Sequence, residues 1–147
     1  MQIDDIMSRK LLLALCFLEV SLLCNPVFSQ VLDPSNLDPG ARQFVTIFFP
    51  ETNIMTATLT DYGYNVTLND FTSIDFDLSF SPLKIDCNES TTYYRVPDNL
   101  VPQQIHDHIS DICKKCYIVV LEYKNQVRVA TLSNGQKIRF VKNRVIK

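Results

Sequence analysis

Glycine is scarce in this chain, with three residues in 147. A phosphate-binding loop needs several glycines close together so that the backbone can approach the phosphates, and the sequence holds no such cluster. No serine or cysteine lies in a recognisable nucleophile motif. His106 and His108 flank Asp107, but residues two apart on a helix point in different directions. The sequence therefore predicts a protein that is not an enzyme and needs neither a cofactor nor a metal.

The chain also lacks a long uninterrupted hydrophobic run. A membrane-spanning helix needs about 20 predominantly apolar residues, whereas the run after Arg9 and Lys10 is broken by Glu19. A basic flank before a short apolar core is typical of a cleavable signal peptide. We expect residues 1–29 to be this peptide, cut after Ser29 or at a neighbouring site, with an uncleaved signal anchor or a buried helix as the alternatives. The mature protein is then secreted, extracellular and without an integral membrane segment.

The rest of the chain has the length of one domain. Residues 30–42 include Pro34 and the turn pair Pro39-Gly40, which predicts an irregular leader. Residues 43–147 are expected to form a single β-rich domain.

Two glycosylation sequons agree with passage through the secretory pathway. They begin at Asn65 and at Asn88, and each has the Asn-x-Ser/Thr pattern that the glycosylation machinery recognises. Both asparagines are therefore predicted to carry glycans and to face solvent.

Strand signals dominate the first half of this domain. Residues 44–49 are rich in β-branched and aromatic side chains and end at Pro50, which predicts a buried strand. Residues 54–59 are the expected neighbouring strand. Residues 74–80 alternate between apolar and polar side chains, which predicts a half-buried strand.

One helix is expected. Pro102 suits a first helical turn, and Ile105, Ile109 and Ile112 follow at the spacing of one helical stripe. The sequence gives no sign of an internal repeat.

Three further strands are expected after this helix. Residues 116–123 are a dense apolar strand, and residues 127–132 are expected to run back after a turn at Lys124-Asn125. Asn134-Gly135 is typical of a two-residue type I′ hairpin. The expected pairs across the hairpin are Thr131 with Ile138 and Val129 with Phe140. The predicted fold class is a β-rich α+β domain, an antiparallel sheet or sandwich with a C-terminal three-stranded meander and one short helix.

The mature chain has an odd number of cysteines. Cys16 and Cys24 leave with the signal peptide, and Cys87, Cys113 and Cys116 remain. Outside the cell we expect one internal bridge from Cys87 to Cys113 or Cys116. The third thiol stays free or joins two chains in a disulfide-linked dimer.

Cys113 and Cys116 allow two other interpretations. Their Cys-x-x-Cys spacing is found in redox sites, but the pair follows the predicted helix, whose C-terminal end disfavours a thiolate. A zinc ion held by both cysteines with His106 and His108 is the second alternative, and a secreted location favours disulfides instead.

Charge is divided unevenly along the chain. Residues 30–113 contain twelve acidic and three basic side chains, whereas residues 114–147 contain nine basic side chains and one acidic one. A basic surface outside the cell can bind a sulphated glycan or an acidic matrix protein. The alternative is that these bases line a solvated hairpin and protect its edge. The candidate polyanion-binding residues are Lys124, Arg128, Lys137, Arg139, Lys142 and Arg144. Nucleic acid is not expected as a partner, because the protein is predicted to be secreted.

One family resemblance arises from three motifs. The chain is similar to the opening half of the protease-associated domain in goliath-like transmembrane RING ubiquitin ligases at residues 41–45, followed by Pro50 and Thr52, at the Tyr62-Gly63-Tyr64 turn and at residues 87–97. The resemblance implies a luminal or extracellular domain that binds proteins or peptides, with Cys87 as a bridge cysteine. The family's Arg-Gly-x-Cys motif, transmembrane helix and RING cysteines have no counterpart here, so ubiquitin transfer is not implied.

The combined expectation is a secreted, non-catalytic module that binds an extracellular protein or peptide through a sheet edge or a loop. A matrix component held to polyanions by the basic C-terminal hairpin is the second hypothesis. A secreted protease inhibitor is the third.

Overall fold

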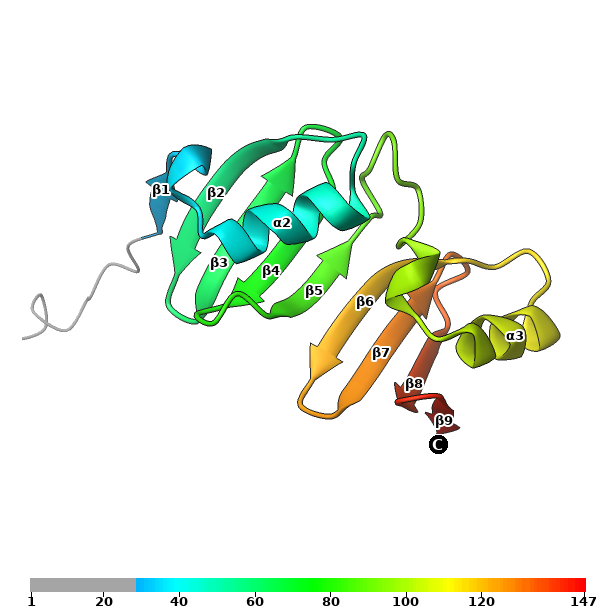
Figure 1. Ribbon diagram of the computed structural model, residues 1–147. Coiled ribbons are helices and arrows are strands. Elements are labelled where there is room, and N and C mark those ends of the chain that lie inside the picture. Colours follow the sequence, from blue (N-terminus) through cyan, green and yellow to red (C-terminus); the bar gives the residue numbers. More distant parts are fainter. Residues whose placement is uncertain (1–28) are drawn as a thin grey trace, which may run out of the picture.

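The computed structural model describes residues 29–147, so the predicted signal peptide lies outside the described residues except for Ser29. These residues form a single nine-stranded antiparallel sheet in which every strand pairs with its neighbour in sequence (Figure 1). The strands are β1 (Gln30–Leu32), β2 (Ile54–Thr60), β3 (Gly63–Leu68), β4 (Ser73–Asp77), β5 (Pro82–Asp86), β6 (Ile118–Lys124), β7 (Val127–Leu132), β8 (Lys137–Val141) and β9 (Arg144–Ile146). The helices are η1 (Pro34–Asn36), α2 (Pro39–Phe48), η2 (Asp98–Leu100) and α3 (Gln103–Ile112).

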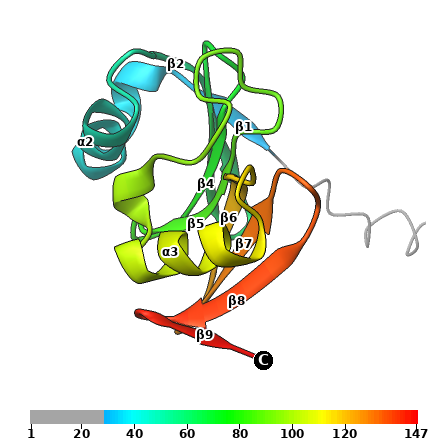
Figure 2. The same cartoon turned by 90° about the vertical axis from the view of Figure 1, so that its right-hand side faces the viewer.

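Both α-helices cover the same face of the sheet, as Figure 2 shows. On this face one in-register row of apolar side chains crosses eight strands: Leu32, Ala57, Val66, Ile74, Ile85, Leu121, Ala130 and Ile138. All except the half-buried Leu32 are buried. Alternate residues of a strand point to opposite faces, so this row fixes which side of every strand faces the core. The sheet is open and not a sandwich, and the β-rich class with a C-terminal meander is confirmed.

The opposite side of the sheet, here called the open face, carries no helix. Its central row consists of Thr58, Asn65, Asp75, Lys84, Glu122, Val129 and Arg139. The alternation of an apolar and a polar row is that of an antiparallel sheet with one solvated side.

Residues 44–49, expected to be a strand, belong to helix α2 and its C-cap instead. The Asp38 carboxylate accepts the Gly40 N–H at 2.7 Å and caps the helix, and Pro39 occupies its first position. Ala41, Val45 and Phe49 are buried, and their spacing of four is helical. The prediction was wrong because β-branched and aromatic composition was given more weight than this spacing.

Residues 30–42 are ordered elements and not an irregular leader. They contain β1, η1 and the start of α2, so the pair Pro39-Gly40 begins a helix where a turn was expected. The expected single helix is likewise one of two α-helices. The helix after Pro102 is confirmed as α3, with Ile105 and Ile109 buried and Ile112 exposed.

Strands β2, β4, β6 and β7 confirm four sequence predictions, although the predicted range of β4 extends too far toward the C-terminus. β4 ends at Asp77, and Leu78 is exposed in the following turn. Phe80 has φ +60° and stacks on Tyr64 at 4.7 Å between ring centroids. The alternation of apolar and polar residues continues through this turn in the sequence, although the backbone there is no longer a strand.

The hairpin between β7 and β8 has a different register from the one expected. Leu132 N–H donates to the Gln136 carbonyl at 2.8 Å, which leaves a three-residue loop, and only Gly135 in this loop has positive φ, at +84°. A type I′ turn would need positive φ at Asn134 as well, whereas one left-handed glycine is typical of the three-residue loop. The observed pairs are Thr131 with Lys137, Ala130 with Ile138 and Arg128 with Phe140.

The structure contains an internal repeat that the sequence did not reveal. Helix α2 and strands β2, β3 and β4 begin at residues 39, 54, 63 and 73, and α3, β6, β7 and β8 begin 64 residues later at 103, 118, 127 and 137. Both units have a register shift at the same place, after Ile54 in β2 and after Ile118 in β6. The identical pairs at this offset are Ile54/Ile118, Thr67/Thr131, Leu68/Leu132, Ile74/Ile138 and Phe76/Phe140. Unit 1 and unit 2 denote these two copies below.

Within residues 29–147, none of the helices combines the length and the apolar character that crossing a membrane requires.

Candidate functional site

The turn between β3 and β4, here called the Phe71 loop (residues 69–72), is held by a buried carboxylate. Asp70 is 3 % exposed. It accepts hydrogen bonds from Thr72 N–H at 3.0 Å, Thr72 Oγ1 at 3.1 Å, Ser90 Oγ at 2.7 Å and Tyr93 N–H at 3.3 Å. The Asp70 carbonyl also accepts Thr91 N–H at 2.8 Å. The loop is therefore fastened to the segment that joins unit 1 to unit 2.

These hydrogen bonds keep Asp70 ionised. Burial alone would raise the pKa of this carboxyl, but hydrogen bonds from Ser90, Thr72 and Tyr93 outweigh it, and the pKa lies below its ordinary value. A charged acceptor makes stronger hydrogen bonds than a neutral one. The geometry of the Phe71 loop is thus set by the folded protein itself.

Phe71 is displayed at the tip of this loop. Its φ is +70°, a left-handed conformation that costs an L-residue other than glycine about 1–2 kcal/mol. Its side chain is 54 % exposed, so burial in the core does not offset this cost. Phe80 has a similar backbone conformation but packs on Tyr64. Phe71 makes no such aromatic contact within residues 29–147.

The second repeat unit shows that the strain at Phe71 is not required by the fold. Gly135 stands at the equivalent position with φ +84°, and Asn134 takes the place of Asp70. One of the Asp70 hydrogen bonds recurs, because Asn134 Oδ1 accepts Gln136 N–H at 2.9 Å as Asp70 Oδ1 accepts Thr72 N–H. Unit 2 therefore makes this turn with the residue that fits it, and unit 1 makes it with an exposed phenylalanine.

The six candidate polyanion-binding residues do not form one cluster. By strand alternation Lys124, Lys137, Arg139 and Arg144 lie on the open face, and Lys142 lies in the turn between β8 and β9. Lys124 is paired with Glu122 at 3.3 Å. The other three open-face bases stand on strands β8 and β9, and residues 123–147 contain no carboxylate side chain.

Arg128 is the exception, because it lies on the helix-covered face beside Phe140. Its Nη1 donates to the Leu100 carbonyl at 3.4 Å, and its guanidinium carbon lies 5.2 Å from the centroid of the Tyr123 ring. Arg128 is thus separated from the other bases by the sheet.

The cysteine pairing differs from the expected one. The bridge joins Cys113 to Cys116, and Cys87 is a free thiol that is 1 % exposed. Burial, and after it the negative charge of Asp70, raises the pKa of the Cys87 thiol to about 12. The expectation failed because Cys87 is buried in the core just after β5, whereas Cys113 and Cys116 are the first and last residues of one turn after α3, in which Cys116 N–H donates to the Cys113 carbonyl at 3.1 Å. No exposed thiol is left among residues 29–147 to link two chains.

The two sequons lie in different surroundings. Asn88 is exposed just after β5. Asn65 is half-buried on the open face, where its Nδ2 donates to Asp75 Oδ1 at 2.7 Å and to Ser73 Oγ at 3.1 Å. A glycan on Asn65 would replace one of the two Nδ2 hydrogens and so remove at least one of these hydrogen bonds. Both sites stay predictions.

The histidines and the acidic side chains do not assemble into a metal site. His106 Nε2 lies 3.1 Å from the Asp98 carbonyl, and Cys113 and Cys116 are bonded to each other. Among residues 29–147 no group of three or more histidine, cysteine, aspartate or glutamate side chains is placed to hold a metal ion.

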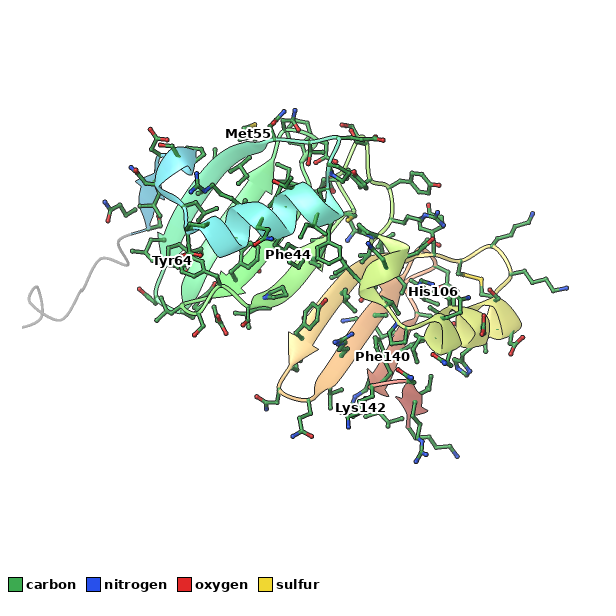
Figure 3. The ribbon with its side chains drawn as sticks, viewed as in Figure 1. Phe44, Met55, Tyr64, His106, Phe140 and Lys142 are labelled. Carbon is green, nitrogen blue, oxygen red and sulfur yellow. A yellow bond between two sulfur atoms is a disulfide. The ribbon has the colours of Figure 1, made fainter. Side chains whose placement is uncertain are left out.

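Comparison with known proteins identifies the fold. No protein-family model matches the chain, and no curated protein matches its sequence. Figure 3 shows the side chains on this fold, with Phe44 on α2 and His106 on α3 among those labelled. A solved structure from Bacteroides thetaiotaomicron, described as a "putative calcium-regulated periplasmic protein", is 18 % identical with a TM-score of 0.71, over 81 % of this chain and 94 % of that one.

Two structures from Bacteroides vulgatus are also similar. One, from a family of domains of unknown function, is 20 % identical with a TM-score of 0.70, over 84 % of this chain and 97 % of that one. The other, a "putative periplasmic protein of unknown function", is 23 % identical with a TM-score of 0.72, over 82 % and 98 %. At these identities the likeness establishes the fold alone. The resemblance to protease-associated domains stays a prediction.

Sequence reasoning missed Asp70 and Phe71. A phenylalanine carries no turn signal of its own, since the left-handed region favours glycine and asparagine. The signal was the 64-residue offset, which aligns Asn69-Asp70-Phe71-Thr72 with Ser133-Asn134-Gly135-Gln136.

Proposed function

We propose that this chain is a non-catalytic binding module that works outside the cytoplasm and docks a partner protein through the Phe71 loop. The observation that carries the proposal is the exposed, left-handed Phe71 held by the buried Asp70. Backbone strain of this kind is found where the surrounding structure fixes a functional conformation.

An aromatic side chain that is already held in place loses little conformational entropy when it binds. Such side chains are enriched among the residues that dominate protein interfaces. Phe71 fits this role because its loop is fastened to Ser90, Thr91 and Tyr93 and its ring faces solvent. The partner is expected to offer an apolar pocket.

The location outside the cytoplasm is supported by three observations. Residues 1–29 have the pattern of a signal peptide, and Cys113 and Cys116 form a disulfide, which persists in oxidising compartments. The structures with a similar fold are described as periplasmic.

Site-specific photo-crosslinking in the protein's own host cells tests the docking surface. The photo-reactive residue p-benzoylphenylalanine replaces Phe71 in one protein and Leu78 in a control. Leu78 is exposed to a similar degree, 62 % against 54 %, but lies in the β4–β5 turn. One discrete crosslinked protein is expected from position 71 and not from position 78. Equal products from both positions, or none from position 71, would contradict the proposal.

A second candidate function, attachment to a polyanion, is supported by the basic open face of unit 2. Lys137, Arg139 and Arg144 face the same side of the sheet, and all three are exposed. No salt bridge to any of them is formed within the described part of the chain. A row of uncompensated bases attracts sulphate or phosphate groups.

Heparin chromatography tests this second candidate. If the basic open face binds polyanions, the double variant Lys137→Glu with Arg139→Glu should elute at clearly lower salt than the wild type, since exposed charge attraction is screened by salt. The matched control is Lys114→Glu with Lys115→Glu, which makes the same change of net charge in the exposed loop after α3. Similar elution of the two double variants would show that net charge alone decides retention.

A further inference from the structure

A groove lies where unit 1 meets unit 2. Strands β5 and β6 share only three registered pairs, Lys84 with Glu122, Ile85 with Leu121 and Asp86 with Val120. The start of β5 and the end of β6 therefore continue without pairing to each other. The space between them has a volume of about 690 Å³, which falls within the usual range for ligand sites, roughly 300–1,000 Å³. The residues that line it are Asp77, Ser81, Pro82, Leu83, Asn99, Leu100, Tyr123, Asn125 and Arg128.

Arg128 is the single basic group in this lining, and the fold holds its guanidinium in place. One N–H donates to the Leu100 carbonyl and the guanidinium plane lies near the Tyr123 ring. No carboxylate within residues 29–147 forms a salt bridge with it. A guanidinium has five N–H donors, so most of those of Arg128 are directed at neither contact. Tyr123 is half-buried, and its pKa lies above its ordinary value because burial raises it more than the charge of Arg128 lowers it.

The lining also holds one carboxylate, Asp77, whose Oδ1 accepts the Ser79 and Ser81 N–H groups at 2.8 and 2.9 Å within the β4–β5 turn. The other lining residues are of two kinds. Pro82, Leu83 and Leu100 supply apolar surface, whereas Ser81, Asn99 and Asn125 supply uncharged donors and acceptors. A guanidinium binds a carboxylate through two parallel hydrogen bonds. Side-chain amides match the N–H and C=O groups of a peptide backbone. A hydrocarbon chain ending in a carboxylate would leave these amides without partners, which is unfavourable where they lose water.

We propose that this groove binds the C-terminal end of a peptide, with Arg128 holding the terminal carboxylate and Leu83 and Leu100 contacting the last side chain. Asn99 and Asn125 bond the peptide backbone. The groove and the Phe71 loop share no residue, so this inference goes beyond the proposed function and does not depend on it.

Titration calorimetry with the purified chain tests the proposal. The probes are a tripeptide ending in leucine, the same tripeptide with its C-terminus amidated, and octanoate. The acid is expected to bind at least about tenfold more tightly than the amide, since a charge-assisted pair of hydrogen bonds is lost on amidation. This comparison needs no variant and so does not depend on a mutant folding.

Two substitutions test whether the peptide binds at Arg128. Arg128→Met is expected to weaken binding of the tripeptide acid by at least about tenfold, whereas Arg42→Met, which removes the same charge from the exposed side of α2, should leave it unchanged. Both variants are compared at equal folded fraction. Equal affinity for acid and amide, an unchanged affinity in Arg128→Met, or no binding at millimolar peptide would overturn the proposal. Octanoate binding as tightly as the tripeptide would overturn the assignment to a peptide.

Discussion

Replacing Asp70 by alanine is expected to lower the free energy of unfolding by about 3 kcal/mol, because several donors lose a charged, buried acceptor at once. The donors affected are Thr72 N–H, Thr72 Oγ1, Ser90 Oγ and Tyr93 N–H. Urea denaturation of the purified protein measures the change. The unfolding free energy of Asp70→Asn should lie between those of the wild type and Asp70→Ala, because the single amide oxygen can accept only some of these hydrogen bonds.

The repeat supplies the control for this experiment. Asn134→Ala removes the equivalent side chain in unit 2, where the acceptor receives one backbone N–H, from Gln136, on an exposed turn. Its cost should stay below about 1 kcal/mol. Equal costs at positions 70 and 134 would show that Asp70 is no more than an ordinary turn residue.

The pH dependence of stability should report on the same carboxylate. The folded pKa of Asp70 is depressed below its ordinary value of 3.8, so its contribution is present above that pH and is lost as the pH falls through the lower, folded pKa. This part of the acid sensitivity should be missing in Asp70→Asn.

Replacing Gly63 by alanine is expected to cost more than about 3 kcal/mol, since overpacking against backbone leaves nothing flexible to move aside. Gly63 opens β3 with φ +155°, and an added Cβ would lie 1.8 Å from the Phe76 carbonyl oxygen. The backbone of β4 would have to shift. Thermal unfolding followed by circular dichroism measures the loss.

Gly135→Ala is the matched control for Gly63→Ala. Gly135 also has positive φ, but a Cβ there would meet nothing within 4 Å. The loss of stability in Gly135→Ala should therefore come from backbone strain alone and amount to about 1–2 kcal/mol. A loss at Gly63 no larger than the loss at Gly135 would mean that β3 and β4 separate easily.

The sequence predicted those parts of the fold in which side-chain period and composition agree. Ile74 and Phe76 alternate with aspartates in a strand, and Ile105 and Ile109 stand four apart in a helix, so β4 and α3 were found. In α2 the two signals disagree, because Val45 and Phe49 favour strands by composition but are spaced for a helix. Burial of the helical stripe against the sheet decided the outcome.

The binding surfaces could not be predicted because they depend on tertiary structure. Phe71 is a candidate only because Asp70 is buried against Ser90 and Tyr93, which are distant in sequence. Arg128 was grouped with the other bases by charge, although strand alternation across the β7–β8 hairpin places it on the opposite face. The hairpin register was wrong by one residue, and a shift of one residue exchanges the two faces of a strand.

Phe71 is central to the proposed function, because its strained conformation is proposed to serve binding. The most direct test of this proposal uses Phe71→Gly, the substitution that reproduces unit 2. Two quantities are measured: the free energy of unfolding, and the ability of the variant to compete with the photo-reactive protein for the partner that it crosslinks. We predict a gain in stability of about 0.5–1 kcal/mol, because relief of the left-handed strain exceeds the entropic cost of glycine, together with loss of competition. Phe71→Ala should lose competition without the gain in stability. A Phe71→Gly protein that competes as well as the wild type would contradict the account.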